Sequence, residues 1–208
     1  AEILKNAGYK NGKDFFVDFD DFIVEEVAIK INDLDELSAY HDSFIFTNFC
    51  YDYHNTLYAD VCIDTDPYNL NAIEKPCQGG ETLNFGSGQG GPVTVERIET
   101  RMFVENDNVR PQFKIYLANR GQGTVIKKNT IDQVCNNVEL GQEIYNTIEL
   151  TALEFSKYNL NDFNCIPEEL NLRRDQEFFV CTLKQGIPKT ISTFKTPLQL
   201  ELDYGYTE

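Results

Sequence analysis

The side chains that could do chemistry in this sequence are mainly carboxylates set in short clusters. Asp18 and Asp20 alternate within VDFDDF, and Asp64 and Asp66 alternate within CIDTDPYN. Alternate residues of a strand lie on one face, and D-x-D is a common opening of a calcium loop. Neither cluster continues into the glycine and closing glutamate of an EF-hand. The sequence therefore favours solvated acidic strand edges that discourage aggregation, and it keeps these four residues as candidate calcium ligands in the alternative.

The two histidines do not belong to a recognisable catalytic motif. His54 lies in CYDYHNT among aromatic residues, and His41 follows Tyr40. General-base catalysis needs a nucleophile and an orienting group beside the imidazole, and neither G-x-S-x-G nor H-E-x-x-H occurs. We therefore expect surface histidines in polar turns and a protein that is not an enzyme. A secreted hydrolase that uses paired carboxylates stays open as an alternative, because so acidic a chain offers many such pairs.

Cysteines are the second group of reactive side chains, and there are six of them: Cys50, Cys62, Cys77, Cys135, Cys165 and Cys181. They form no C-x-x-C pair, which makes a zinc site a poor interpretation. An even number in an acidic, asparagine-rich chain is typical of a disulfide framework, and disulfides persist in oxidising compartments. The sequence predicts three disulfides and a secreted or cell-surface location.

The spacing of the cysteines favours one connectivity. If residues 44–50 and 57–63 form a hairpin, Cys50 and Cys62 do not face each other across it. The shortest remaining loops, of about 15 residues, would each contribute roughly 3 kcal/mol in the chain-entropy model. Closing those two loops and pairing the cysteines left over gives Cys62–Cys77, Cys165–Cys181 and Cys50–Cys135. Other connectivities stay open, since six cysteines can pair in many ways.

The balance of charge excludes several partners. Lys and Arg number 18 against 34 Asp and Glu, for a formal net charge of −16 in 208 residues. The only basic doublets, at 127–128 and 173–174, are isolated, so the chain lacks the electropositive footprint of a protein that binds nucleic acid or an anionic membrane. No apolar run reaches the length of a spanning helix, and we expect no membrane insertion of this segment. The chain begins at Ala1, which fits cleavage after an export signal or a trimmed N-terminus.

The elements that would position these side chains are mostly strands. Apolar and polar residues alternate with the period of a half-buried strand in four stretches: 27–31, 57–63, 113–117 and 198–202. Helical periodicity is scarce, and its best candidate is 33–40, with Asp33 as N-cap. A second helical turn is expected at 167–170, which begins with proline. The pattern predicts an all-β fold with short helical turns.

A glycine-rich stretch divides the chain near its middle. Residues 78–91 read QGGETLNFGSGQGG, and glycines at that density suppress regular structure. The stretch lacks G-K-[ST] and leads into the strand-like VTVERIETRMFV, so it is not a phosphate-binding loop. We expect the boundary here, with an N-terminal β-sandwich domain over 1–90 and a C-terminal one over 91–208.

A resemblance to a known family enters at PQFKIYLANRGQGTV, residues 111–125. An alternating strand ends in Asn119, and Gly121 and Gly123 supply the turn before the next strand starts at Thr124. This segment resembles the strand-turn-strand of immunoglobulin-like modules of the CARDB type in prokaryotic cell-surface proteins. Together with the closing strand PLQLELDYGY, it is also similar to secreted or membrane-anchored proteins of archaea. The resemblance implies two immunoglobulin-like antiparallel β-sandwich domains with a structural or adhesive role and no active site.

The neighbouring VENDNVRPQF, residues 104–113, is similar to the calcium-binding linker of cadherins, D-x-N-D-N-x-P-x-F. It departs from that motif because Val109 and Arg110 both precede the proline, where one residue is expected. The sequence here predicts a local turn rich in Asn and Asp.

The function that fits these features is structural. We expect an extracellular structural or adhesive surface protein, such as the subunit of a filament or sheath in which copies associate by β-strand addition. The expected interface residues lie near the two ends of the chain: Ile3, Leu4, Tyr204 and Tyr206. The two tyrosines would serve equally well as interface anchors or as core filling, and a ladder between Ile3 and a second copy would support the assembly. The alternative is a monomeric secreted module that binds calcium or carbohydrate and no other cofactor.

Overall fold

The structure is a computed structural model that describes most of the chain from Asn48 onward. Described are residues 44, 47–70, 74–86, 89–136, 138, 140–173 and 177–208, and the backbone of 2–3 and 29–30. The chain forms two units, Ala1–Thr47 and Asn48–Glu208. In the first unit, β1 (Glu2–Ile3) pairs antiparallel with β2 (Ile29–Lys30), so that Ile3 lies opposite Ile29 of the same chain.

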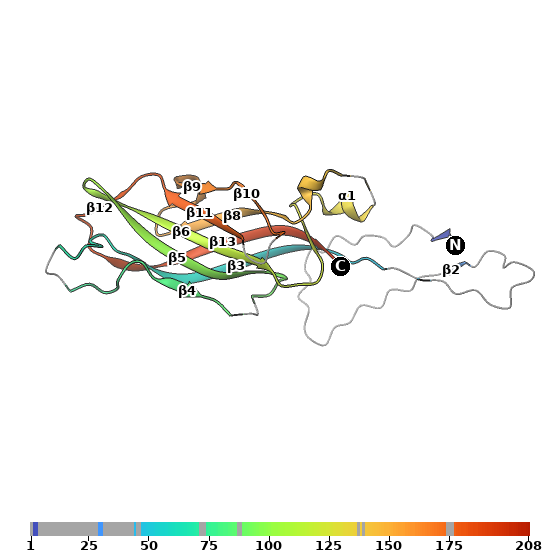
Figure 1. Cartoon of the computed structure of the whole chain (residues 1–208), viewed down its shortest axis with the longest axis horizontal. Coiled ribbons are helices and arrows are strands. Elements are labelled where there is room, and N and C mark those ends of the chain that lie inside the picture. The colour runs from blue at the N-terminus through green and yellow to red at the C-terminus, as the bar shows by residue number, and fades with distance from the viewer. Residues whose placement is uncertain are drawn as a thin grey trace, which may run out of the picture. The chain divides into compact units, whose positions relative to one another are not determined.

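The second unit contains two antiparallel sheets (Figure 1). The β13 sheet has the order β10-β8-β13-β3, and β7 also pairs with β13. Its strands are β3 (Cys50–Ile63), β7 (Thr124–Ile126), β8 (Thr147–Phe155), β10 (Glu169–Asn171) and β13 (Phe194–Thr207). The β6 sheet has the order β4-β5-β6-β11-β9, and β12 also pairs with β6. Its strands are β4 (Thr82–Asn84), β5 (Val93–Glu105), β6 (Asn108–Asn119), β9 (Phe163–Ile166), β11 (Glu177–Leu183) and β12 (Ile187–Pro188).

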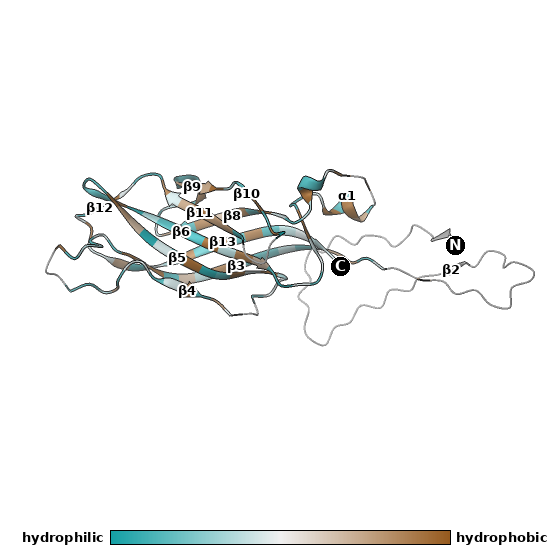
Figure 2. Cartoon of the chain, in the orientation of Figure 1, coloured by the Kyte–Doolittle hydropathy of each residue, from teal (hydrophilic) through white to brown (hydrophobic). Residues whose placement is uncertain are grey.

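The alternation of side chains along the strands builds a core between the two sheets (Figure 2). In β13, Leu198, Leu200 and Leu202 are each 1% exposed, and the residues between them point to the other face. Phe113 of β6 meets Phe155 of β8 edge to face, with ring centroids 5.7 Å apart. Buried residues from both sheets belong to one hydrophobic cluster. The second unit is therefore a β-sandwich.

Short helical segments connect some of the strands. α1 (Ile131–Cys135) and η1 (Gln142–Ile144) lie between β7 and β8, and η2 (Leu160–Asp162) lies between β8 and β9. The expected all-β class with short helical turns is confirmed. Within the part of the chain that the structure describes, every helix is too short to cross a membrane.

Most of the predicted strands are found. Stretches 57–63, 113–117 and 198–202 fall inside β3, β6 and β13, and β2 lies within 27–31. The turn expected in 104–113 joins β5 to β6 at Asn106 and Asp107, where Asn106 has the left-handed φ of 51° that asparagine tolerates. The helix expected at 33–40 lies outside the described residues.

Two expectations need correction. The structure divides the chain after Thr47 and not at residue 90, because β3 pairs along its whole length with β13 and the glycine-rich stretch contains β4, which pairs with β5. Residues 48–90 thus share one core with the rest of the sandwich, and the expected domains 1–90 and 91–208 are not seen. The helical turn predicted at 167–170 is also wrong, because the chain turns at Pro167 between β9 and β10, and β10 pairs with β8.

Candidate functional site

The longest edge of the sandwich belongs to β3. All 14 residues of β3 pair with β13, from Cys50 opposite Thr207 to Ile63 opposite Phe194, without a register shift. Among the residues that the structure describes, β3 has no strand on its other side. At ~3.3 Å per residue this edge is about 45 Å long. The strands at the other sheet ends are short: β10 and β4 have three residues each, and β9 has four.

The sequence of β3 carries few of the usual devices that protect an edge. Natural edge strands are blunted by charged residues, above all lysine, by proline, by bulges or by being short. CYDYHNTLYADVCI contains Asp52 and Asp60 but no lysine and no proline, and its ladder with β13 has no bulge. Tyr58, near the middle of the strand, is 65% exposed. The edge therefore presents a row of backbone groups that can serve as a template for another strand.

Disulfides fix β3 at both ends. Its first residue, Cys50, is bonded to Cys135 at the end of α1, and Cys62 is bonded to Cys77 in the loop that follows the strand. Such bridges indicate an oxidising environment. The third disulfide joins β9 to β11 in the other sheet, between Cys165 and Cys181.

These pairings are the three that the spacing argument favours, but one premise of that argument is wrong. No hairpin turn occurs at 51–56, because β3 runs straight through those residues. Cys50 and Cys62 are kept apart by the length of a single strand, which leads to the same conclusion.

A buried polar contact holds the middle of β3 against the β6 sheet. Asn55 Nδ2 donates to the Val93 carbonyl oxygen at 3.0 Å and to Tyr204 Oη at 3.3 Å, and the Val93 amide donates to the same Oη at 3.2 Å. Gly91 passes so close that a Cβ there would lie 2.5 Å from Asn55 Nδ2. Burial raises the pKa of Tyr204 well above its ordinary value, so this hydroxyl stays neutral.

The residues expected at an interface lie elsewhere. Tyr204 and Tyr206 are 1% and 2% exposed, because the inward alternation of β13 continues through them, and they are core residues. Ile3 pairs with Ile29 of its own chain, and the ladder to a second copy that was expected there stays a prediction. Leu4 lies outside the described residues.

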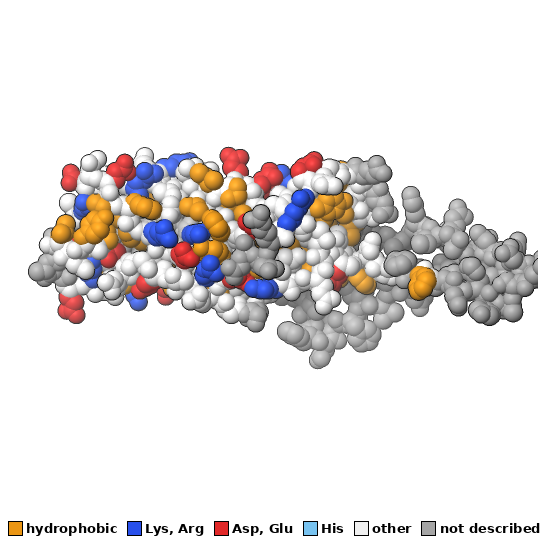
Figure 3. All heavy atoms as spheres, in the orientation of Figure 1, with side chains coloured by type: hydrophobic (Ala, Val, Ile, Leu, Met, Phe, Trp, Pro, Cys, Tyr) orange, Lys and Arg blue, Asp and Glu red, His pale blue; other side chains and the backbone are white. Residues whose placement is uncertain are grey.

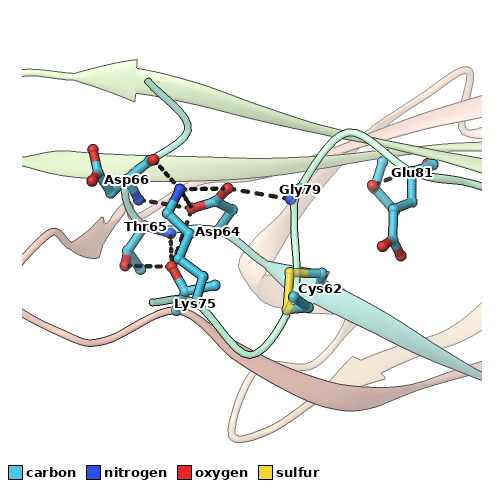
Figure 4. Close-up of a disulfide and its surroundings, with 10 residues drawn as sticks. Cys62, Asp64, Thr65, Asp66, Lys75, Gly79 and Glu81 are labelled. Atoms are coloured by element: carbon cyan, nitrogen blue, oxygen red, sulfur yellow. Dashed lines mark hydrogen bonds and ion pairs between the residues drawn. A yellow bond between two sulfur atoms is a disulfide. The ribbon is translucent and has the colours of Figure 1, made fainter. Parts of the chain in front are cut away.

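The loop closed by the Cys62–Cys77 disulfide contains a buried ion pair (Figure 4). The Asp64 side chain is 2% exposed, and Lys75 Nζ donates to its Oδ1 at 2.9 Å and to its Oδ2 at 3.1 Å. The same ammonium donates to the backbone carbonyl oxygen of Asp66. Carboxylate and carbonyl oxygens are calcium ligands, so the Lys75 ammonium takes the position that a bound cation would need.

Three further donors point at the Asp64 carboxylate. The amides of Asp66 and Gly79 donate at 3.0 and 3.2 Å, and the Thr193 hydroxyl donates at 3.1 Å. Burial raises the pKa of Asp64, but Lys75 and these donors outweigh that effect, and the net result is a lowered pKa and an ionised side chain. Gly79 is required for the close approach, because a Cβ there would lie 2.7 Å from the Asp64 Cβ.

Asp64 and Asp66, the two predicted calcium ligands that the structure describes, each have other partners. Asp64 binds Lys75, and Asp66 Oδ1 accepts the amide of Leu70 at 2.9 Å. Within the described ranges, no group of three or more carboxylate, imidazole or thiol side chains is placed to hold a metal ion. Asp18 and Asp20 lie outside those ranges. We interpret residues 62–77 as a loop closed by lysine and a disulfide.

His54 has partners that the sequence did not reveal. Its Nδ1 faces Asp203 Oδ1 on the paired strand β13, and its Nε2 lies 3.3 Å from Thr56 Oγ1. Burial raises the pKa of Asp203, but hydrogen bonds from Lys128 and His54 outweigh it and lower that pKa. Hydroxyl, imidazole and carboxylate follow each other as in a hydrolase triad. The His54 side chain is 57% exposed on the outer face of a sheet, whereas such chemistry needs a water-excluding site, so we interpret the three as a cross-strand network.

No protein-family model, curated protein or solved structure matches this chain. The turn of the segment 111–125 is as expected, since β6 ends at Asn119, β7 begins at Thr124, and Asn119 Nδ2 donates to the Gly123 carbonyl oxygen at 2.9 Å. The likeness of this segment to CARDB-type modules stays a prediction.

Proposed function

We propose that this protein is an extracellular structural or adhesive surface protein whose copies associate by β-strand addition along β3. The observation that supports this is the 14-residue edge, which has no partner among the described residues and carries neither lysine, proline nor bulge. Globular proteins ordinarily protect an edge of that length, so a weakly protected one favours a partner strand.

The partner strand is the β3 of a second copy. It is the long edge that the described residues leave without a neighbour, and two such edges pair antiparallel around a two-fold axis at right angles to the sheet. This contact joins the two β13 sheets into one continuous sheet. The Cys50–Cys135 and Cys62–Cys77 bridges support the contact by holding β3 in its extended shape before a partner arrives, which lowers the entropic cost of association.

The setting that fits this role is outside the cell. Three disulfides belong to an oxidising compartment, and a net charge of −16 keeps dispersed copies soluble until the specific edge contact forms. The likeness of residues 111–125 to CARDB-type modules supports the finer proposal of an immunoglobulin-like sandwich of the kind found on prokaryotic, including archaeal, surfaces.

The edge contact is tested by placing a lysine on β3. Lysine is the residue by which natural edge strands most often discourage the addition of another strand, so Tyr58→Lys should blunt this edge. Sedimentation of the wild-type chain is expected to show a dimer, and Tyr58→Lys is expected to weaken that dimer about tenfold, or ~1.4 kcal/mol. Amide hydrogen exchange along β3 should slow as the wild-type concentration rises, because its outward amides become hydrogen-bonded.

The matched control is Gln199→Lys. Gln199 is the direct cross-strand neighbour of Tyr58 and points to the same face, but it lies on β13, one strand in from the edge. This variant should dimerise like the wild type. A chain that stays monomeric at every concentration, or a dimer weakened equally by both lysines, would contradict pairing through the edge.

A further inference from the structure

The outer face of the β6 sheet carries rows of basic and aromatic side chains. Directly opposed residues of an antiparallel sheet point to the same face, which places Arg97, Tyr116 and Phe178 in one row across β5, β6 and β11. The Arg97 guanidinium lies 3.5 Å from the Tyr116 ring centre, and Lys114 Nζ lies 3.9 Å from that of Phe178. These cation–π contacts hold the positive charges flat against the sheet.

This face is unusually basic for so acidic a chain. Four of the six arginines lie on or beside it: Arg97, Arg101, Arg110 and Arg120. The four arginines pair with three carboxylates: Glu99 lies beside Arg97 and Arg101, Glu105 beside Arg110, and Glu96 beside Arg120. Lys114 is a fifth cation on this face, so positive charge is in excess, and the Arg101 side chain is 61% exposed. Figure 3 shows Lys and Arg side chains interleaved with hydrophobic ones over β5, β6 and β11. The exposed hydrophobic residues include Phe178, at 37%, and Ile166, at 61%.

The outer face of the β13 sheet has the opposite character. The registers place Tyr58, Gln199 and Glu154 in one row, and Asp60 and Glu201 point to the same face one row to either side. None of the described basic side chains pairs with Asp60, Glu154 or Glu201. Carboxylates are therefore in excess on one outer face of the sandwich, and cations are in excess on the other.

We propose that the basic outer face of the β6 sheet binds the acidic outer face of the β13 sheet of another copy. The contact joins two different surfaces of the same protein, so it is heterologous. When copies related by translation stack through such a contact, it repeats without closing into a ring. It rests on the proposed function, because the partner is again this chain. The edge contact makes a closed dimer, and the face contact extends that dimer into a filament or layer.

The geometry of the dimer favours this stacking. A two-fold axis at right angles to the sheet leaves both copies with their β13 faces on the same side, so the dimer has one surface with an excess of carboxylates and one with an excess of cations. β6 has 12 residues and is about 40 Å long at ~3.4 Å per residue. Neighbouring strands lie ~4.8 Å apart, so about three to four strands of this length cover roughly 600–800 Å² per copy. A standard protein interface buries ~800 Å² per partner, which is close to this area.

The test reverses charge on one face at a time and follows assembly beyond the dimer by light scattering and electron microscopy. Arg101→Glu/Lys114→Glu should abolish higher assembly and leave the dimer intact. Glu154→Lys/Glu201→Lys should do the same. An equimolar mixture of the two variants should assemble again. The native acidic face of the first variant then meets the native basic face of the second, and the two reversed faces, which now carry opposite charges, meet each other. Raising salt from 0.05 to 0.5 M should dissolve the stacks but not the dimers, because exposed charges are screened within about 10 Å or less.

Controls separate the two proposals. Lys157→Glu/Lys184→Glu changes net charge equally at exposed turns off both faces, and it should assemble normally. Thermal unfolding checks that each variant is folded. Stacks that survive Arg101→Glu/Lys114→Glu, that ignore salt, or that fail to return in the mixture would overturn the face contact while the edge contact stands. Wild-type chains that stack without ever forming the dimer would instead keep the face contact and reject the edge.

Discussion

Lys75 illustrates how a single side chain decides what a loop can do. Its ammonium satisfies a carboxylate that is 2% exposed, and removing one partner of such a pair leaves an uncompensated charge. We expect Lys75→Met to lower the free energy of unfolding by about 3 kcal/mol in urea titrations. The exposed Lys195→Met is the control and should stay within about 0.5 kcal/mol of wild type.

The double variant Asp64→Asn/Lys75→Met removes both charges at once. It should recover part of the lost stability, because no charge is then left unpaired. A Lys75→Met protein as stable as the wild type would mean that the loop relaxes and lets water reach Asp64.

The lowered pKa of Asp64 has a definite consequence for acid stability. In the unfolded chain the carboxyl titrates near its ordinary pKa of 3.8, and in the folded chain Lys75 and the surrounding donors hold that pKa lower. The ionised form therefore stabilises the fold fully above pH 3.8, and the contribution is lost as pH falls through the lowered pKa. The stability gap between wild type and Asp64→Asn should narrow over that acid range in urea titrations at stepwise pH. A gap that keeps its size would show that Asp64 does not stabilise through its charge.

Residue types alone could not reveal these partnerships. The D-x-D cluster at Asp64 and Asp66 was visible in the sequence, but Lys75 reaches it from 11 residues away across a disulfide-closed loop. Composition alone favoured an interface and a core position equally for Tyr204 and Tyr206. The inward alternation of side chains along β13 continues through both residues and places them in the core. Asp203 beside His54 is a cross-strand neighbour 149 positions away, which no local pattern contains.

At the scale of elements, β3 depends on its two sulfur bridges to different degrees. The Cys50–Cys135 loop spans 85 positions and the Cys62–Cys77 loop spans 15. The chain-entropy model gives about 4.5 kcal/mol for the first and about 3 kcal/mol for the second. Cys50→Ala/Cys135→Ala should therefore lower the free energy of unfolding more than Cys62→Ala/Cys77→Ala. The reverse order in urea titrations would show that local strain, and not loop length, governs these bridges.

The periodicity of the sequence predicted the positions of strands well, but it did not predict which strands pair with each other. Alternation located β3, β6 and β13 because a half-buried strand needs one apolar face. It carries no information on pairing, so residues 44–63 suggested a hairpin, whereas β3 lies beside the last strand of the chain. The cysteine pairing succeeded because short loops close at least entropic cost, whichever strands lie between them.

At the scale of the whole molecule, the glycine-rich stretch was misleading because glycine marks a turn as readily as a linker. Part of this stretch, Thr82–Asn84, is β4 of the β6 sheet. The first and last strands of the second unit, β3 and β13, are paired, so its core closes only when both ends of that unit are present. Such long-range pairing predicts slow folding relative to helical proteins of this size.

Under the proposed edge contact, the sulfur bridges at the two ends of β3 also set when a copy is able to pair with another. In a reducing compartment the chain carries thiols, and its edge strand is then not yet clamped and would be a poor template. In an oxidising compartment the bridges form, and the same chain would become a building block. Bond formation between sulfurs would thus license polymerisation, and would keep the fibre from growing inside the cell that makes it.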